Sequence, residues 1–403
     1  LIIVAGFSFL GFGVQAPDYD WGRMLAQGLK GLYVTPLPAL APGVAVALAG
    51  LACSALCDRL GGARARISHA APLAPTSKPL PARSSGPSQS LTVRGLTLRH
   101  PGGTIISDLD LDLHAGEILG LVGESGSGKT SLAQAIAGLS APVIEVQATR
   151  LAIAGKDLNT LTTQERAAWL GRRIGFVFQD ALSAFNPLIA VGRQIAERLE
   201  VHGQQSPAVA NSAAVAALAD VGLSDPPRQA RQRPAALSGG MRQRALIAMG
   251  LVVKPDLLLA DEPTTALDTT VQAQVLDLLR AAADDGCSVL FVSHDLPVVA
   301  QLCTRVAVLY AGRIVEILAP ADLRPHGPRH PYTRALVSCV PWASSPDDDR
   351  LAVIPGAVSP DDAAAPGCAF APRCNLAQAN CRTQRPSLGR DGVACWYPYE
   401  IRT

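Results

Sequence analysis

Aromatic residues and an excess of charge of either sign are both lacking in this chain. Phe, Trp and Tyr make up 4% of its 403 residues, and 35 basic against 33 acidic residues leave a formal net charge of +2. Nucleic-acid binding usually needs a basic surface and often uses aromatic stacking, so the composition argues against a nucleic-acid partner. Nine cysteines are too few for a disulfide scaffold, and 48% hydrophobic residues are too many for a disordered chain.

Charge is missing altogether from two stretches near the N-terminus. Residues 1–17 and 31–57 contain no Asp, Glu, Lys or Arg, and the second stretch has 27 residues. A helix needs about 20 apolar residues to cross a bilayer. With Trp21 between the stretches and basic residues from Arg59 onward, the pattern predicts a transmembrane hairpin over residues 1–60 and a cytoplasmic location for the remainder of the chain. Buried core helices, or a signal peptide, are the alternatives.

A segment poor in periodic hydrophobic residues comes after the two stretches. Residues 61–90 are rich in Ala, Pro, Ser and Gly. This composition predicts a flexible linker, because it offers no apolar face to bury. The sequence is therefore expected to divide into the apolar N-terminal piece and a separate body that begins near Leu91.

The strongest motif of this body is Gly123–Thr130, with the sequence GESGSGKT. An apolar strand is predicted before it at 117–122 and a helix after it at 131–137. Glycines let backbone N–H groups approach phosphate oxygens, and the helix start adds the positive end of its dipole. Lys129 would lie between the β- and γ-phosphates, and Thr130 would bind Mg²⁺. The expected nucleotide contacts are Gly123, Ser125, Gly126, Gly128, Lys129, Thr130 and Ser131.

A second motif supplies acidic residues at the end of an apolar strand. Residues 256–262 read DLLLADE. Asp261 is expected to hold Mg²⁺ through its water shell, and Glu262 to orient or polarise the attacking water. Together the two motifs predict a site that binds and hydrolyses ATP with Mg²⁺.

Residues Leu237–Gln243 (LSGGMRQ) resemble the signature motif of ABC transporter ATPases. The other motifs of that superfamily occur in the expected order, with Gln179 matching the Q-loop, Asp268 the D-loop and His294 the H-loop. The resemblance implies an α/β fold of the P-loop NTPase class. Within this fold it implies an ABC nucleotide-binding domain at 91–320.

The same resemblance implies a mechanism shared by two domains. ATP would be sandwiched between two head-to-tail nucleotide-binding domains, with contacts across the interface from Ser238, Gly239, Gly240 and Asp268. Gln179 would sense the metal ion and the attacking water, and His294 would contact the γ-phosphate. A helical subdomain at about 182–240 would meet the membrane partner.

One position departs from the superfamily pattern. Its members usually stack adenine on an aromatic residue near the start of the domain, and the corresponding residue here is His100. An imidazole offers less stacking area than Tyr or Phe. The alternative is a surface histidine at the end of an edge strand.

Finer similarity points to the dipeptide/oligopeptide importers, some of which handle nickel. It lies in Phe178–Pro187, in Leu237–Met249 and in the tail segment His330–Leu336. It implies a subunit that powers peptide uptake across the cytoplasmic membrane, with permease subunits, a periplasmic or extracellular solute-binding protein and a second ATPase domain as partners. Uptake of nickel or another small solute, or a non-transport ABC ATPase, is the alternative.

The apolar N-terminal stretches also resemble part of these importers. Residues 8–26 are similar to the last two spans of the permease subunit. This resemblance implies a permease end fused to its ATPase, with upstream sequence missing from the chain.

Four cysteines lie close together near the end of the C-terminal extension, 321–403. They are Cys368, Cys374, Cys381 and Cys395, with the spacing C-x5-C-x6-C-x13-C. Clustered cysteines in a cytosolic domain favour metal binding over disulfides. Similar tails in some members of the importer family carry a [4Fe–4S] cluster, which implies these four thiolates as its ligands. Unligated structural thiols are the alternative.

Overall fold

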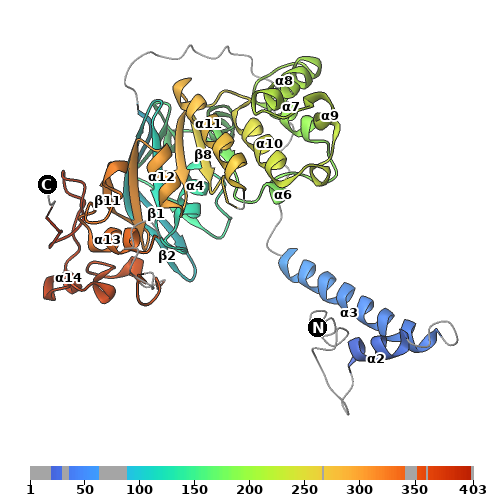
Figure 1. Cartoon of the computed structure of the whole chain (residues 1–403), viewed down its shortest axis with the longest axis horizontal. Helices are drawn as coiled ribbons and strands as arrows, with labels where there is room; N and C mark the ends of the chain where they lie inside the picture. Colours follow the sequence, from blue (N-terminus) through green and yellow to red (C-terminus); the bar gives the residue numbers. More distant parts are fainter. Residues whose placement is uncertain are drawn as a thin grey trace. The chain divides into compact units, whose positions relative to one another are not determined.

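The computed structural model describes residues 20–29, 36–62, 89–340 except 266, 352–359 and 362–400. The chain divides into two compact units, Leu1–Pro79 and Leu80–Thr403. Figure 1 shows the elements of each unit.

The N-terminal unit contains two described helices. Helix α2 (Trp21–Gly28) begins at Asp20, whose carboxylate accepts a hydrogen bond from Arg23 N, and α3 (Leu37–Gly62) contains Pro42. No helix within the described residues is both long enough and apolar enough to cross a membrane. The hairpin predicted over residues 1–60 is therefore not supported, and its first uncharged stretch lies outside the described residues.

The C-terminal unit is built on two sheets, the first of which is antiparallel. Its strand order is β2-β1-β5-β6, and β4 also pairs with β1. The alternation of buried and exposed residues in β2 gives this sheet one core face and one solvent face. The strands are β1 (Gln89–His100), β2 (Gly103–His114), β4 (Glu145–Gln147), β5 (Arg150–Ile153) and β6 (Lys156–Asp157).

The second sheet has the order β11-β10-β3-β9-β8-β7 and is parallel except for the β10–β11 pair. Every residue of β3, β8 and β9 is buried, which explains why these strands are continuous apolar runs in the sequence. The strands predicted before the glycine loop and before Glu262 are confirmed. The strands are β3 (Ile118–Val122), β7 (Ile174–Val177), β8 (Leu257–Asp261), β9 (Ser288–Val292), β10 (Arg305–Tyr310) and β11 (Arg313–Leu318).

Helices surround the sheets and also form a separate group. Helix α4 (Lys129–Ala137) follows the glycine loop and confirms the helix predicted there. Figure 1 shows α6 to α10 gathered to one side of the sheets. The group is α6 (Ala181–Ala184), α7 (Val191–Val201), α8 (Pro207–Asp220), α9 (Pro226–Arg231) and α10 (Gly239–Leu251). The remaining helices around the sheets are α5 (Thr163–Arg173), α11 (Thr269–Asp284) and α12 (Leu296–Leu302).

The C-terminal extension packs against β10 and β11. It includes α13 (Pro331–Ser338), the short 3₁₀ turn η7 (Ala371–Arg373) and α14 (Ala379–Thr383). Phe370 packs its ring 5.3 Å from that of Tyr310 in β10 and 5.4 Å from that of Tyr332 in α13. Ala394 N donates to Val315 O at 2.9 Å. The extension is thereby joined to the edge of the parallel sheet.

Candidate functional site

The glycine loop between β3 and α4 has a main chain that only glycine accommodates at its first position. Gly123 has a φ of +155°, and a Cβ there would lie 2.1 Å from the carbonyl oxygen of Leu309. Gly128, with a φ of +103°, would bring a Cβ within 2.8 Å of Ile106. By contrast, a Cβ at Gly126 would meet no atom within 4 Å. The loop is therefore backed closely by β2 and β10 but open on the side of Gly126.

Lys129 is anchored within the loop that precedes it. Its side chain is buried, and its Nζ donates to Gly123 O and Glu124 O, each at 2.9 Å. Burial lowers the pKa of Lys129, and the nearby charges of Glu262 and Asp261 act in the opposite direction. The ammonium group thus already lies at the centre of the loop, where a phosphate would be bound.

Thr130 and Asp261 are adjacent although they come from different elements. Thr130 Oγ1 donates to Asp261 Oδ1 at 3.2 Å. Burial at the end of β8 raises the pKa of Asp261, and the hydrogen bond from Thr130 and the charge of Lys129 oppose that rise. A hydroxyl beside a carboxylate is the kind of oxygen donor set that Mg²⁺ prefers. The two residues therefore fit the magnesium site expected from the sequence.

Glu262 lies at the centre of a hydrogen-bonded group. Its Oε2 accepts from Gln179 Nε2 and from Thr265 Oγ1, both at 3.0 Å, and its Oε1 lies 3.0 Å from His294 Nδ1. Gln179, Glu262 and His294 follow β7, β8 and β9, which are neighbours in the sheet. The structure therefore brings together the three residues predicted as catalytic.

Two features of this group were absent from the sequence prediction. Thr265 was not predicted, although it lies three residues after Glu262 in the same turn. Glu262 also has a φ of +45°, a backbone conformation that costs free energy in a non-glycine residue. Backbone strain of this kind concentrates at functional sites.

The signature residues lie at the start of α10. Ser238 Oγ accepts from Met241 N at 3.3 Å and caps this helix. A Cβ at Gly239 would meet no atom within 4 Å, whereas one at Gly240 would lie 2.9 Å from Val271 in α11. Asp268 caps α11, with its Oδ1 accepting from Val271 N at 2.9 Å. The predicted cross-interface residues thus sit at two neighbouring helix starts, which favour anions.

His100 borders a cavity of about 370 Å³ next to the glycine loop. Its Nδ1 accepts from Gly102 N at 3.1 Å, which fixes the ring at the end of β1. Gly126 also lines this cavity, as do Val358 and Ala363 of the C-terminal extension. The structure therefore places His100 beside the loop, and it adds two lining residues that no sequence motif indicated.

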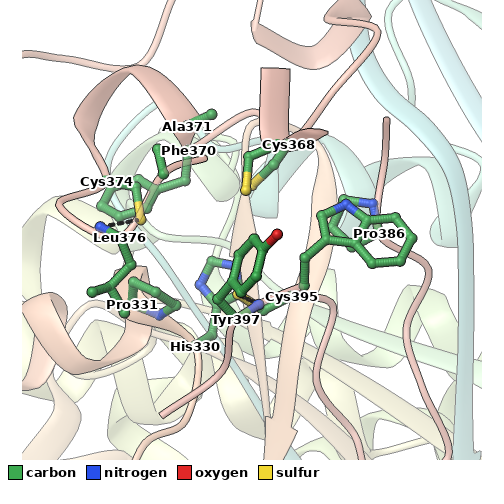
Figure 2. Close-up of a pocket in the computed structure, with 13 residues that line it drawn as sticks. His330, Pro331, Cys368, Phe370, Ala371, Cys374, Leu376, Pro386, Cys395 and Tyr397 are labelled. Carbon is green, nitrogen blue, oxygen red and sulfur yellow. Dashed lines mark hydrogen bonds between the residues drawn. The ribbon is translucent and has the colours of Figure 1, made fainter. Parts of the chain in front are cut away.

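The four tail cysteines line one small cavity of about 20 Å³, and Figure 2 shows Cys368, Cys374 and Cys395 around it. All four are free thiols. Backbone N–H groups donate to Cys374 Sγ and Cys395 Sγ, each at 3.4 Å, and burial raises the pKa of Cys368 to about 11. We call this the four-thiol cavity.

The four-thiol cavity does not form a metal site in this geometry. Within the described ranges, no group of three or more His, Cys, Asp or Glu side chains is placed to hold a metal ion. The pKa values of Cys374 and Cys395 are also raised, chiefly by burial, so the thiols favour their protonated form. The predicted [4Fe–4S] ligand set is therefore not supported as it stands.

The parallel sheet and the loop between β3 and α4 place the chain among the P-loop ATPases. The protein-family model described as "ABC transporter" matches residues 106–265. A second model, described as the oligopeptide/dipeptide transporter C-terminal region, matches residues 315–381. Neither match includes residues 1–60, so the predicted permease fusion gains no support from them.

Curated relatives match most of the chain. A probable peptide ABC transporter ATP-binding protein of Sinorhizobium fredii is 42% identical over 73% of this chain and 90% of its own length. The dipeptide transport ATP-binding protein DppD of Escherichia coli is 38% identical over 73% and 91%, respectively. OppD of Mycobacterium tuberculosis is 43% identical over 75% of this chain, but the match spans only 50% of OppD. The chain belongs to the ABC transporter ATP-binding proteins of this peptide-transport type.

Solved structures of ABC cassettes share the fold. The dimeric bacterial ABC transporter cassette MJ0796 superposes with a TM-score of 0.51 and 28% identity, over 57% of this chain and 98% of the cassette. A post-hydrolysis dimer of the same cassette, bound to ADP and Pi, gives a TM-score of 0.51 at 27% identity. The chain is thus an ATPase of the ABC class.

Proposed function

We propose that this chain is the ATP-hydrolysing subunit of an importer that takes up dipeptides or oligopeptides across the cytoplasmic membrane. The observation that carries the proposal is the joining of an ABC ATPase site to an oligopeptide/dipeptide-type C-terminal region in one chain. Relatives named for peptide transport, at 38–43% identity, support the same solute class.

Phosphate binding is assigned to the glycine loop. The buried ammonium group of Lys129 would exchange its two carbonyl partners for β- and γ-phosphate oxygens. Mg²⁺, held by Thr130 and Asp261, would neutralise negative charge on the phosphates. Ser131, in the first turn of α4, completes the predicted set.

Hydrolysis is assigned to the group around Glu262. The Glu262 carboxylate would accept hydrogen bonds from the attacking water and increase its nucleophilicity. Gln179 would contact the metal ion and this water, and His294 would contact the γ-phosphate. Both residues already hydrogen-bond to the Glu262 carboxylate, and an acceptor position on Oε1 is left for the attacking water.

The adenine base is assigned to the cavity beside His100. The cavity is next to Gly126, so a base there would lie on the open side of the phosphate loop. The imidazole would stack on the base with less area than a phenyl ring offers. Val358 and Ala363 would supply the apolar contacts of the opposite wall.

Two copies of the nucleotide-binding domain would close over ATP. Ser238, Gly239, Gly240 and Asp268 of one copy would complete the site of the other, with the start of α10 directed at the γ-phosphate. Dimeric cassettes among the structural neighbours support this arrangement. The second copy is either identical or a related subunit, and permease subunits would hold the pair at the cytoplasmic face of the membrane.

Transport is tested with proteoliposomes that contain the chain, permease subunits and a solute-binding protein from the same organism. Dipeptide or oligopeptide uptake should require ATP and should stop in Glu262→Gln. Uptake of Ni²⁺ but not of peptides would instead assign the chain to the nickel branch. ATPase activity stimulated by nucleic acid, without uptake of either solute, would contradict the importer assignment.

A narrower proposal concerns an iron–sulfur cluster in the four-thiol cavity. Four thiols around one cavity are the right donor set for a [4Fe–4S] cluster, and two backbone N–H groups already donate to their sulfur atoms. A cavity of about 20 Å³ is too small for a cluster, so the cysteine-bearing loops would have to move apart. Anaerobically purified protein should then contain iron and sulfide, and Cys374→Ser should lose both. Metal-free protein after anaerobic reconstitution would exclude the cluster.

A further inference from the structure

Glu124, the second residue of the glycine loop, is fixed by three separate contacts. Its carboxylate receives two parallel hydrogen bonds from Arg373, at 2.7 and 2.9 Å. Its backbone N–H donates to Tyr332 Oη at 2.8 Å, and its carbonyl accepts from Lys129 Nζ at 2.9 Å. Arg373 and Tyr332 both belong to the C-terminal extension. The extension therefore binds the phosphate loop at two points of Glu124, its side-chain carboxylate and its backbone N–H.

Arg373 is itself rigidly held. Its side chain is only 8% exposed, and its Nε donates to Pro355 O at 2.7 Å. Its Nη1 also donates to Tyr310 Oη at 3.2 Å, and the paired carboxylate of Glu124 raises the pKa of the guanidinium. A two-point arginine–carboxylate pair with fixed surroundings defines both distance and direction. Glu124 therefore has little freedom to move while Arg373 is in place.

An aromatic cluster anchors this arginine to the sheet. The rings of Tyr310 and Tyr332 lie 4.5 Å apart, and Phe370, three residues before Arg373, packs against both. The Glu124–Arg373 pair is separated by 249 positions in the sequence, yet it lies beside the strand that backs the loop. The aromatic cluster thus holds Arg373 in position for its contact with Glu124.

We propose that Arg373 is a positioning residue of the ATPase, which sets the conformation of the phosphate-binding loop through Glu124. The proposal rests on the assignment of that loop to the phosphates of ATP. A loop held in its binding conformation avoids an ordering cost when the nucleotide binds, so Arg373 raises ATP affinity without itself touching ATP. Arg373 is followed directly by Cys374, so the four-thiol cavity adjoins the residue that pairs with Glu124.

The test measures Mg·ATP binding and the kcat and KM of phosphate release for the full chain. Arg373→Ala should raise the Kd and KM for ATP about tenfold and change kcat much less, because it removes preorganisation and not a reacting group. Glu124→Ala should have the same effect, and the double variant should lose no more ATP affinity than either single variant. Arg373→Lys keeps the charge but loses the two-point geometry, so its Kd and KM for ATP should lie between those of wild type and Arg373→Ala.

The matched control is Arg329→Ala. Arg329 pairs with Asp391 at 2.8 Å within the same extension, and this pair does not involve the glycine loop. Its loss should leave ATP affinity unchanged. Equal ATP affinity in Arg373→Ala and wild type, or additive losses in the double variant, would overturn the positioning role while leaving the ATPase assignment intact. Wild-type protein that fails to bind Mg·ATP would instead overturn the assignment of the loop itself. If Arg373→Ala does not fold, Glu124→Gln and Arg373→Lys answer the same question.

Discussion

His294 Nδ1 lies 3.0 Å from Glu262 Oε1, while Gln179 and Thr265 donate to the other oxygen of the same carboxylate. Both oxygens of Glu262 are therefore engaged within the protein in this conformation. Since each carboxylate oxygen can accept about two hydrogen bonds, Oε1 keeps one position for a water molecule.

Glu262→Gln should abolish phosphate release while leaving ATP binding intact. An amide keeps the shape of the side chain but cannot act as a general base, and such a loss typically costs about 10²–10⁴ in rate. Phosphate release gives the rate, and size-exclusion chromatography with Mg·ATP should show an ATP-bound dimer. Glu145→Gln, an exposed acidic residue of β4, serves as the control. A Glu262→Gln variant with wild-type turnover would refute the assigned role.

His100→Tyr should tighten ATP binding, and His100→Ala should weaken it. The phenol ring offers a larger stacking face than imidazole, and an aromatic contact is worth about 0.5–1.5 kcal/mol, or about two- to tenfold in Kd. Equilibrium titration with Mg·ATP measures the change. His114→Ala, at the exposed end of β2, is the control. Identical affinities for all three His100 side chains would place the base elsewhere.

Gly123→Ala should destabilise the protein more than Gly155→Ala. Both glycines have a positive φ, but an alanine Cβ at Gly123 would clash with Leu309 O, whereas one at Gly155 would meet no atom within 4 Å. Backbone strain alone costs about 1–3 kcal/mol, and the clash adds to it only at Gly123. Thermal unfolding of the nucleotide-free variants compares the two. A larger loss of stability in Gly155→Ala would contradict the close backing of the loop by β10.

The thiol of Cys368 should lower stability at high pH. Burial raises its pKa to about 11, above the value of 9.0 for an ordinary cysteine. Because the folded state favours the protonated thiol, this contribution is complete below about pH 9 and is lost as the pH rises toward 11. The Tm of metal-free wild type should therefore fall more steeply over this range than that of Cys368→Ser. Parallel Tm curves would show that the thiol is not buried in solution.

Alkylation with iodoacetamide provides a second measurement on the same thiol. At pH 8 the thiolate fraction of Cys368 is small, so modification should be slower than that of an unfolded cysteine by about tenfold or more. The comparison uses the same protein in denaturant as its own reference. Rapid modification of the native protein would contradict the burial.

Sequence motifs identify much of this site because the sheet brings distant strand ends together. Gln179, Glu262 and His294 each follow a buried apolar strand, and parallel neighbours direct their carboxyl ends to one edge. The glycine loop is equally predictable, since its spacing determines its geometry. The fold class and the predicted catalytic group therefore both follow from short segments of sequence.

Other features depend on contacts that have no local signature. The pairing of Glu124 with Arg373 spans 249 positions, and neither residue is unusual in its own segment. The hairpin predicted over residues 1–60 rests on composition alone, and no described helix is long and apolar enough to support it. A run without charged residues shows that a segment is apolar, but it does not show whether lipid or protein surrounds that segment. Similarly, the clustering of four cysteines favours metal binding, but spacing alone does not show whether the sulfur atoms reach metal-binding distances, and in the structure the four thiols only share a cavity.

The contact between Glu124 and Arg373 has a practical consequence for anyone who trims this protein. A fragment that stops after β11 would retain every recognised ATPase motif, yet it would lack the guanidinium and the Tyr332 hydroxyl that hold Glu124. Such a shortened cassette would report a weaker nucleotide grip than the intact polypeptide. The Kd and KM for ATP measured on it would therefore reflect the loss of the C-terminal extension as well as the properties of the ATPase site.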